Sequence, residues 1–267
     1  MLKISLRQLL SQQHLVIQPV SIFVYIAMKG FTLLYISLLL SCSKMQPADT
    51  QRNKVKLSYL ALGDSYTVGE GVSTSESFPY QLVDKLRRDS ISLATPKIIA
   101  RTGWTTDELQ AAIDKENLPK NFDLVTLLIG VNNQYRNYAI GQYRLEFRKL
   151  LQQAIMFAGD NKARVVVLSI PDWSVTPFAK NSGRSPADIA EAIDAFNSVN
   201  KEETAAVGVS YIDITPVSRK AASDRSLIAA DGLHPSDKMY ADWVELITAQ
   251  LKNAGWSLQK SPPPHHL

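Results

Sequence analysis

The sequence has few of the side chains that form disulfides or metal sites. It contains one cysteine, Cys42, so no disulfide forms within the chain and a cysteine-based metal site has no second thiolate. Of the four histidines, His14 lies in the amino-terminal segment, and His265 and His266 lie in a proline-rich tail. Only His234 belongs to the body of the chain. Any imidazole chemistry in that body therefore depends on His234.

An excess of one charge is also missing. The chain has 29 lysines and arginines against 25 acidic residues, and residues 1–41 hold three of the basic ones and no acidic one. The rest of the chain is nearly neutral, whereas nucleic-acid binding depends on clustered basic side chains that neutralise phosphates. We therefore expect no nucleic-acid partner. The segment GDSYTVGEG has neither the GxGxxG pattern nor a phosphate-binding lysine, which argues against a flavin or nucleotide carrier.

The amino-terminal segment has no long apolar run free of charge. Its apolar stretch, residues 31–40, is shorter than the ~20 residues of a membrane-spanning helix and is typical of a signal peptide that begins at Met28. The motif LLSC at residues 39–42 resembles a bacterial lipobox, whose cysteine is lipidated. We therefore predict a signal peptide over residues 1–41, in which residues 1–27 are an upstream extension from a mis-assigned start codon.

This interpretation predicts a location for the protein. The chain would be exported to the bacterial cell envelope and anchored by lipid on Cys42, in the periplasm or at the outer membrane. The alternative is an ordinary transmembrane anchor over residues 15–40. Residues 42–54 are polar and lack apolar periodicity, as expected of a tether, and residues 256–267 are predicted to form a loose tail.

Residues 55–255 alternate short apolar runs with longer amphipathic segments. This pattern predicts one α/β domain with three layers, in which a five-stranded parallel sheet lies between helices. The expected strands are residues 55–62, 97–100, 124–129, 164–169 and 209–212. The expected helices are residues 79–88, 106–115, 138–158, 186–207 and 236–252. Ligands of such sheets bind at the carboxyl ends of the strands, so function is expected in the loops there.

A serine and the single histidine of the body lie in two such loops. Ser65 follows the first strand directly, in a position that suits a nucleophile, although Asp and Ser in loops more often shape turns or cap helices. A serine hydroxyl needs a base, and His234 is the one available imidazole. Asp231, three residues upstream, can accept a hydrogen bond from one ring nitrogen while the other faces the serine. A metal site at Asp231 and His234 is less favoured because no further histidine or cysteine lies nearby.

Two further loops offer hydrogen-bond donors for an oxyanion. Gly103 can present its backbone N–H without an obstructing side chain, and Asn132 can present its amide immediately after the third strand. Each residue taken alone is equally typical of an ordinary turn or loop.

Together these residues occur in the order of the four sequence blocks of the SGNH, or GDSL, hydrolase family, which residues 57–251 resemble. Gly-Asp-Ser-Leu appears as GDSY, Gly-x-Asn-Asp appears as residues 130–133, and Asp-x-x-His appears at Asp231 and His234. The resemblance implies that Ser65 is the nucleophile and that Ser65, Gly103 and Asn132 form the oxyanion hole. It also implies that no metal or organic cofactor is needed.

The sequence departs from the family pattern twice. Tyr66 replaces the leucine after the nucleophile, which changes the packing behind it. Asn133 replaces an aspartate beside the oxyanion loop, so any ordering of that loop has to be done by a neutral amide. Four residues are candidates for substrate contact: Asp64, Trp104, Asn133 and Trp173. On or close to the same loops lie two further aromatic residues, Tyr135 and Phe178, and two basic ones, Arg101 and Arg136.

The expected function is hydrolysis of a carboxylic ester, either a lipid acyl ester or a carbohydrate O-acetyl ester, through an acyl-enzyme on Ser65. A catalytically silent ligand-binding lipoprotein on the same fold is the alternative, since a fold does not fix a function. The five residues of the triad and oxyanion hole argue against it, because a binding protein has no need for all of them.

Overall fold

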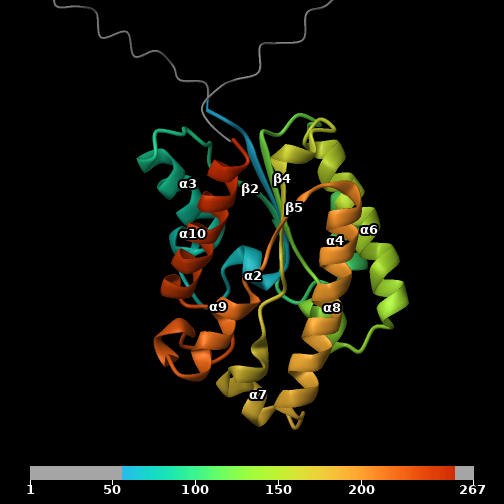
Figure 1. Ribbon diagram of the computed structural model, residues 1–267, viewed down its shortest axis with the longest axis vertical. Helices are drawn as coiled ribbons and strands as arrows, with labels where there is room; N and C mark the ends of the chain where they lie inside the picture. The colour runs from blue at the N-terminus through green and yellow to red at the C-terminus, as the bar shows by residue number, and fades with distance from the viewer. Residues whose placement is uncertain (1–55, 256–267) are drawn as a thin grey trace, which may run out of the picture. The chain divides into compact units, whose positions relative to one another are not determined.

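The computed structural model describes residues 56–255, which all belong to one compact unit (Figure 1). The predicted signal peptide, with Cys42, the tether and the tail lie outside the described residues. The described part is a five-stranded, fully parallel sheet in the order β2-β1-β3-β4-β5, which confirms the predicted fold. The strands are β1 (Tyr59–Gly63), β2 (Lys97–Ala100), β3 (Leu124–Leu128), β4 (Val165–Leu168) and β5 (Ser210–Ile212).

The three central strands are buried on both faces, because helices cover the two sides of the sheet. Every residue of β1, β3 and β4 is buried, which explains their nearly continuous apolar sequences YLALG, LVTLL and VVVL. In the register, Gly63 pairs with both Ala100 of β2 and Leu128 of β3. The carboxyl ends of β2, β1 and β3 are therefore level, and the loops that follow these three strands start at one edge of the sheet.

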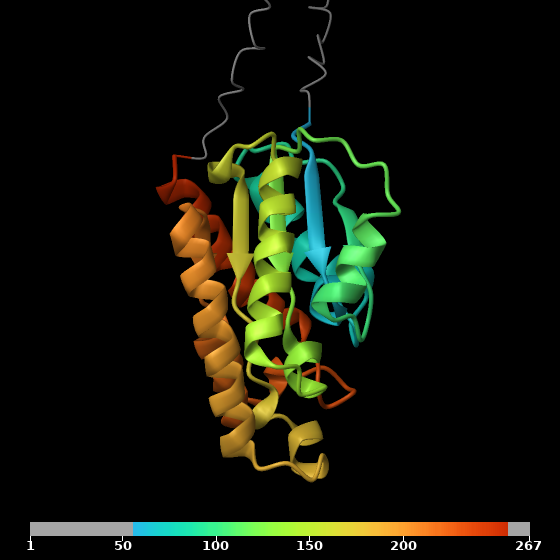
Figure 2. The same ribbon diagram turned by 90° about the vertical axis from the view of Figure 1, so that its right-hand side faces the viewer.

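Helices cover both faces of the sheet (Figures 1 and 2). One face carries α3 (Phe78–Arg88) and α10 (Asp237–Asn253), and the other carries α4 (Thr106–Ile113), α6 (Ile140–Phe157) and α8 (Pro186–Val207). None of the helices between residues 56 and 255 has the length and apolar character needed to cross a membrane.

The longest helix shows how the sequence sets a helix boundary. Helix α8 begins with a proline at its first position, and the Ser185 side chain accepts a hydrogen bond from the backbone of Asp188. The helix ends at Gly208, which has the left-handed φ of 73° that a glycine cap allows. Both boundaries coincide with the predicted helix over residues 186–207.

Several short elements, most of them at the carboxyl edge, are absent from the sequence-based expectation. They are α2 (Ser65–Val68), α5 (Val131–Tyr135), α7 (Pro177–Asn181), α9 (Thr215–Arg219) and the 3-10 turns η2 (Thr74–Glu76), η3 (Lys162–Arg164), η4 (Trp173–Val175), η5 (Lys220–Ala222) and η6 (Arg225–Leu227). They are too short to show helical periodicity in the sequence. Most other predicted boundaries shift by one or two residues, and the start of the first strand shifts further. β1 begins at Tyr59 instead of residue 55, since Leu57 forms only an isolated bridge with Leu93, and α6 begins at Ile140 instead of residue 138, because Ala139 is its extended N-cap with a ψ of 133°.

Candidate active site

Ser65 lies at the point where β1 passes into α2. Asp64 precedes it as the N-cap of α2, and its carboxylate accepts a hydrogen bond from the backbone N–H of Tyr66. Burial raises the pKa of Asp64 to about 7, and the backbone hydrogen bond from Tyr66 opposes that rise. The first turn of α2 therefore holds the Ser65 hydroxyl at the end of the strand, where 5% of the residue is exposed.

Ser65, His234 and Asp231 form a hydrogen-bonded chain. The Ser65 Oγ atom lies 3.0 Å from His234 Nε2, and His234 Nδ1 lies 2.7 Å from Asp231 Oδ2. The other carboxylate oxygen, Oδ1, accepts the backbone N–H groups of Leu233 and His234. Two residues that are 169 positions apart in sequence are thus brought into contact by the fold.

The Asp231 carboxylate is poised to stay ionised. Partial burial favours its neutral form, but hydrogen bonds from the Leu233 backbone and from His234 outweigh this and hold the pKa of Asp231 below its usual range. An ionised Asp231 accepts from Nδ1–H and leaves Nε2 as the acceptor facing the serine. The arrangement can therefore remove the proton from the Ser65 hydroxyl.

A glycine that the sequence analysis did not single out makes room for this chain of contacts. Gly71 has a φ of 85°, and a Cβ atom on it would lie 2.9 Å from Asp231 Oδ2 and 2.9 Å from the Ala229 side chain. The loop after α2 can therefore pass beside Asp231 only with glycine at this position. The sequence signal was the third and last glycine of GDSYTVGEG, which has no other function in the motif.

The predicted oxyanion donors Gly103 and Asn132 line the same cavity as Ser65. Gly103 has a φ of 88°, and its carbonyl accepts a hydrogen bond from the Arg136 guanidinium at 2.7 Å. The Asn132 amide donates one hydrogen to the Trp104 carbonyl at 2.9 Å, which leaves its second hydrogen for a ligand. Two side chains at the carboxyl edge of β3 thus hold the loop that contains Gly103.

Asn133 orders the same region from within the core. This fully buried side chain accepts from the Thr106 backbone N–H at 3.0 Å and donates to Thr106 Oγ1 at 2.6 Å. The Thr106 hydroxyl in turn donates to Glu146. Because the hydroxyl proton is committed to a carboxylate, position 133 has to supply a donor, which an amide does and an ionised aspartate cannot.

A cavity of about 190 Å³ opens beside Ser65 and His234. Its wall contains Tyr135, Trp173 and Phe178, whose ring centroids lie 5.6 to 6.3 Å apart. The indole N–H of Trp173 donates to the Gln134 side chain at 2.9 Å, so a buried polar atom of this wall is satisfied. The space next to the serine is therefore mostly apolar, and three aromatic rings bound it, of which Trp173 is buried and hydrogen-bonded.

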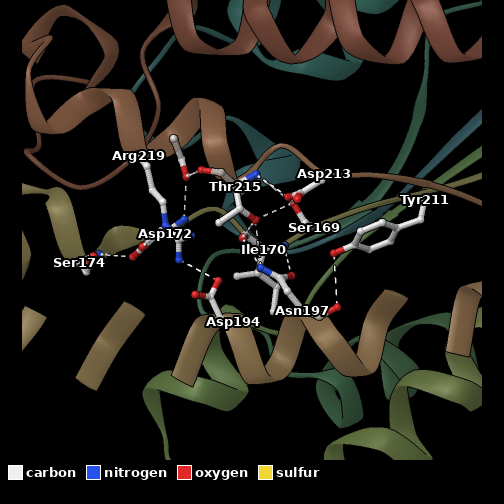
Figure 3. Close-up of polar contacts among 11 residues, drawn as sticks. Ser169, Ile170, Asp172, Ser174, Asp194, Asn197, Tyr211, Asp213, Thr215 and Arg219 are labelled. Atoms are coloured by element: carbon white, nitrogen blue, oxygen red, sulfur yellow. Dashed lines mark hydrogen bonds and ion pairs between the residues drawn. The ribbon is translucent and has the colours of Figure 1, made fainter. Parts of the chain in front are cut away.

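A polar network behind the cavity wall holds the segment that carries Trp173 (Figure 3). The buried Asp172 carboxylate accepts from the Ser174 backbone N–H at 2.8 Å and from Arg219 Nε at 2.8 Å. Arg219 also contacts Asp194 on α8, at 2.7 Å. The indole is thus held directly by α5, and the segment that carries it is held by α9.

Three residues predicted to contact substrate do not line this cavity. Asp64 is buried as a helix cap, Trp104 offers its carbonyl to Asn132 while its ring packs against the core, and Asn133 is enclosed in its network with Thr106. Of the four candidates, only Trp173 lines the cavity. Asp64 and Asn133 each accept a hydrogen bond from a buried backbone N–H, that of Tyr66 and that of Thr106 respectively. No group of acidic, cysteine and histidine side chains in residues 56–255 has the arrangement of a metal site.

Known structures share this architecture. A lipase/acylhydrolase from Enterococcus faecalis is 24% identical over 77% of this chain and 100% of its own, with a TM-score of 0.55. The psychrotrophic esterase EstA from Pseudoalteromonas sp. is 16% identical over 75% and 99%, with a TM-score of 0.54. The acetylxylan esterase Axe2 from Geobacillus stearothermophilus is 15% identical over 78% and 100%, with a TM-score of 0.55. At these identities the likeness shows the fold.

The sequence itself supplies the family assignment. No curated protein matches the chain. The sequence profile of the GDSL-like lipase/acylhydrolase family matches residues 61–241, a segment that begins in β1 and ends in α10 and so contains all three members of the hydrogen-bonded chain. The chain therefore belongs to the GDSL-like lipase/acylhydrolase family, a family of hydrolases.

Proposed function

We propose that the protein is a serine esterase that cleaves a carboxylic ester through an acyl-enzyme on Ser65. The observation that carries the proposal is the contact of Ser65 Oγ with His234 Nε2, at 3.0 Å, beside an open cavity. A hydroxyl next to a base that is itself oriented by a carboxylate is the arrangement of an activated nucleophile. Membership of a family of hydrolases supports the same reaction class.

The reaction proceeds in two steps on the same residues. Ser65 Oγ attacks the ester carbonyl while His234 takes the hydroxyl proton, and the imidazolium then protonates the leaving alcohol as the bond between the acyl carbon and that alcohol breaks. A water molecule, activated by His234 in the same way, releases the acid and restores Ser65. Asp231 keeps the imidazole in the required tautomer throughout.

The oxyanion of each tetrahedral intermediate is held by three donors. They are the backbone N–H groups of Ser65 and Gly103 and the Asn132 amide, and removal of one such donor costs about 3 kcal/mol in transition-state stabilisation. The Asn132 contact with the Trp104 carbonyl supports this role, since it fixes the amide plane before substrate binds.

The cavity favours a short acyl group over a long lipid chain. Its volume of about 190 Å³ is below the ~300–1,000 Å³ of pockets that enclose a drug-sized ligand. The ring cluster of Tyr135, Trp173 and Phe178 supplies an apolar wall for such a group. Among the two substrate classes expected from the sequence, a small O-acyl ester, as on a carbohydrate, therefore fits the cavity better.

The test is turnover by a Ser65→Ala variant. We expect it to lose hydrolysis of a nitrophenyl acetate and to keep the thermal unfolding midpoint of the unchanged protein. A fluorophosphonate should add one covalent adduct, by intact mass, to the unchanged protein and none to the variant. Equal hydrolysis by both proteins would refute the assignment. Binding of the ester without turnover or labelling in the unchanged protein would identify it as a silent binding protein.

We also propose export and lipid anchoring through Cys42. The LLSC motif that follows the apolar residues 31–40 supports this, as does the absence of any other cysteine in the sequence. Intact mass of the protein extracted from membranes tests it. A mature chain that begins at a lipid-modified Cys42 is expected, and a mature chain that retains Met1 would overturn both the signal peptide and the anchor.

A further inference from the structure

Tyr66 is the residue next to the nucleophile that sets this chain apart from the GDSL pattern. Its ring lies against the His234 imidazole, with the ring centroids 5.7 Å apart and the planes inclined by 66°. It is 3% exposed, and it also lines the cavity beside Ser65. A leucine at this position has no flat face or edge to offer the imidazole.

The imidazole of His234 needs such a neighbour because its last torsion is soft. Rotation about the bond that joins the ring to Cβ has broad, roughly two-fold minima, so the side chain alone does not fix the ring plane. Yet the plane has to point Nδ1 at Asp231 and Nε2 at Ser65 at the same time. Asp231 fixes the position of Nδ1, and rotation of the imidazole ring about its Cβ bond is limited further by the side chain that packs against the ring, which is Tyr66.

The Tyr66 ring is itself held by other rings. It meets Trp243 of α10 in a T-shaped contact with centroids 6.3 Å apart, and Trp243 packs against Phe78 of α3 and Tyr240. Phe78, Tyr240 and Trp243 are fully buried. An aromatic row thus runs from the helices on one face of the sheet to the imidazole, and it gives Tyr66 little freedom to move away.

We propose that the Tyr66 ring is a positioning group that holds the imidazole plane of His234 toward the Ser65 hydroxyl. The inference rests on the proposed function. The ring carries the effect, since among residues 56–255 burial and nearby carboxylates, and no hydrogen bond, act on the phenol oxygen. Burial, with neighbouring carboxylates, raises the pKa of Tyr66 above its usual value, so the phenol stays neutral.

The test compares turnover numbers per labelled active site. Tyr66→Leu removes the ring, Tyr66→Phe keeps it, and Tyr59→Leu is a matched control that removes an equally buried tyrosine from the other end of β1. Each protein is titrated with a fluorophosphonate, and the maximal rate of nitrophenyl acetate hydrolysis is divided by the concentration of labelled sites to give kcat, so that loss of folded protein does not enter the comparison. KM does not depend on the amount of active protein and is compared directly.

We expect Tyr66→Leu to lower kcat about 3- to 10-fold with KM within two-fold, as for the loss of one aromatic pair contact. Tyr66→Phe should keep most of kcat, and Tyr59→Leu should lower the thermal midpoint without lowering kcat per site. If Tyr66→Leu does not fold, Tyr66→Met, which is unbranched, takes its place with the same expectation.

Three results would overturn the inference. The first is an unchanged kcat in Tyr66→Leu. The second is a raised KM with unchanged kcat in Tyr66→Leu, which would make Tyr66 a substrate contact. The third is an equal loss of kcat in Tyr66→Phe, which would assign the effect to the hydroxyl. The proposed function fails separately, if Ser65→Ala keeps its activity. A dead Ser65→Ala with a fully active Tyr66→Leu would therefore reject the positioning role alone.

Discussion

Replacement of Asp231 by asparagine should invert the tautomer of His234 while leaving the loop intact. The reason lies in the separate partners of the two carboxylate oxygens. Oδ1 accepts two backbone N–H groups, from Leu233 and His234, and Oδ2 faces Nδ1 of the imidazole. An asparagine has one oxygen, and two fixed donors hold that oxygen at the Oδ1 position. Its NH2 group therefore has to face the imidazole.

An amide donor opposite Nδ1 makes that nitrogen an acceptor and moves the ring proton to Nε2. The ring then offers a donor to the Ser65 hydroxyl and cannot remove its proton. We expect kcat to fall by about 10³- to 10⁴-fold, which corresponds to ~4–5.5 kcal/mol in the activation free energy. The free energy of unfolding should change little, because both backbone hydrogen bonds persist.

The assay is hydrolysis of nitrophenyl acetate, with thermal unfolding of the same preparations. Asp231→Ala is the matched comparison, since it removes the backbone contacts as well and should lower the unfolding midpoint, which Asp231→Asn should not. An Asp231→Asn variant within ten-fold of the unchanged kcat would refute the tautomer argument. A large loss of stability in that variant would refute the assignment of the two oxygens.

The remaining predictions concern the oxyanion donors and two buried side chains. Asn132→Ala should lower kcat about 10²- to 10³-fold with little change in KM, measured on the same ester. Asn133→Asp should lower the free energy of unfolding in urea by about 2–3 kcal/mol, because the Thr106 hydroxyl donates its hydrogen to Glu146 and has none for a second carboxylate. Glu146→Gln should recover part of that loss. Simple additivity of the two changes in unfolding free energy would contradict the network. Burial raises the pKa of Asp64 to about 7, so its carboxyl group stays protonated in the folded state at pH values where the unfolded chain, above about pH 4, has released the proton. The contribution of this proton to the free energy of unfolding is therefore complete below about pH 4 and is lost as the pH rises to about 7. Over that range the unfolding free energy should fall by about 1.4 kcal/mol per pH unit more in the unchanged protein than in Asp64→Asn, and parallel pH curves for the two proteins would argue against it.

The sequence was enough to predict the sheet and the loops that matter, for a physical reason. Strands buried on both faces have to be apolar throughout, so LVTLL and VVVL indicate central parallel strands without any further information. Parallel strands end at one edge, and that alone gathers the segments after β1, β2 and β3. His234 lies in the loop before α10 and follows none of these strands, so its contact with Ser65 was indicated by the Asp-x-x-His block and not by the strand pattern. The chemical roles of the two residues stay predictions.

The contacts between side chains were not predictable in the same way. Tyr66 after the nucleophile suggested a change in packing, but its partner is a histidine from a loop 168 positions away, and no local pattern encodes that contact. Asp64 and Asn133 were among the expected substrate contacts, and neither lines the cavity beside Ser65. Asp64 caps a helix, and Asn133 accepts a hydrogen bond from the backbone N–H of Thr106.

The two departures from the family pattern act on different parts of the same site. Asn133 fixes the segment that carries Gly103 through Thr106, and so bears on where the oxyanion is held. Tyr66 packs on His234, and so bears on how the base meets the serine. Neither residue supplies a charge or a proton, because one is an amide and the other a buried neutral phenol. If both act by orientation, the fold loss of kcat in the double variant Tyr66→Leu with Asn133→Asp should equal the product of the fold losses in the two single variants. The reason is that the two residues share no partner, and the oxyanion and the base contribute independently to the transition state.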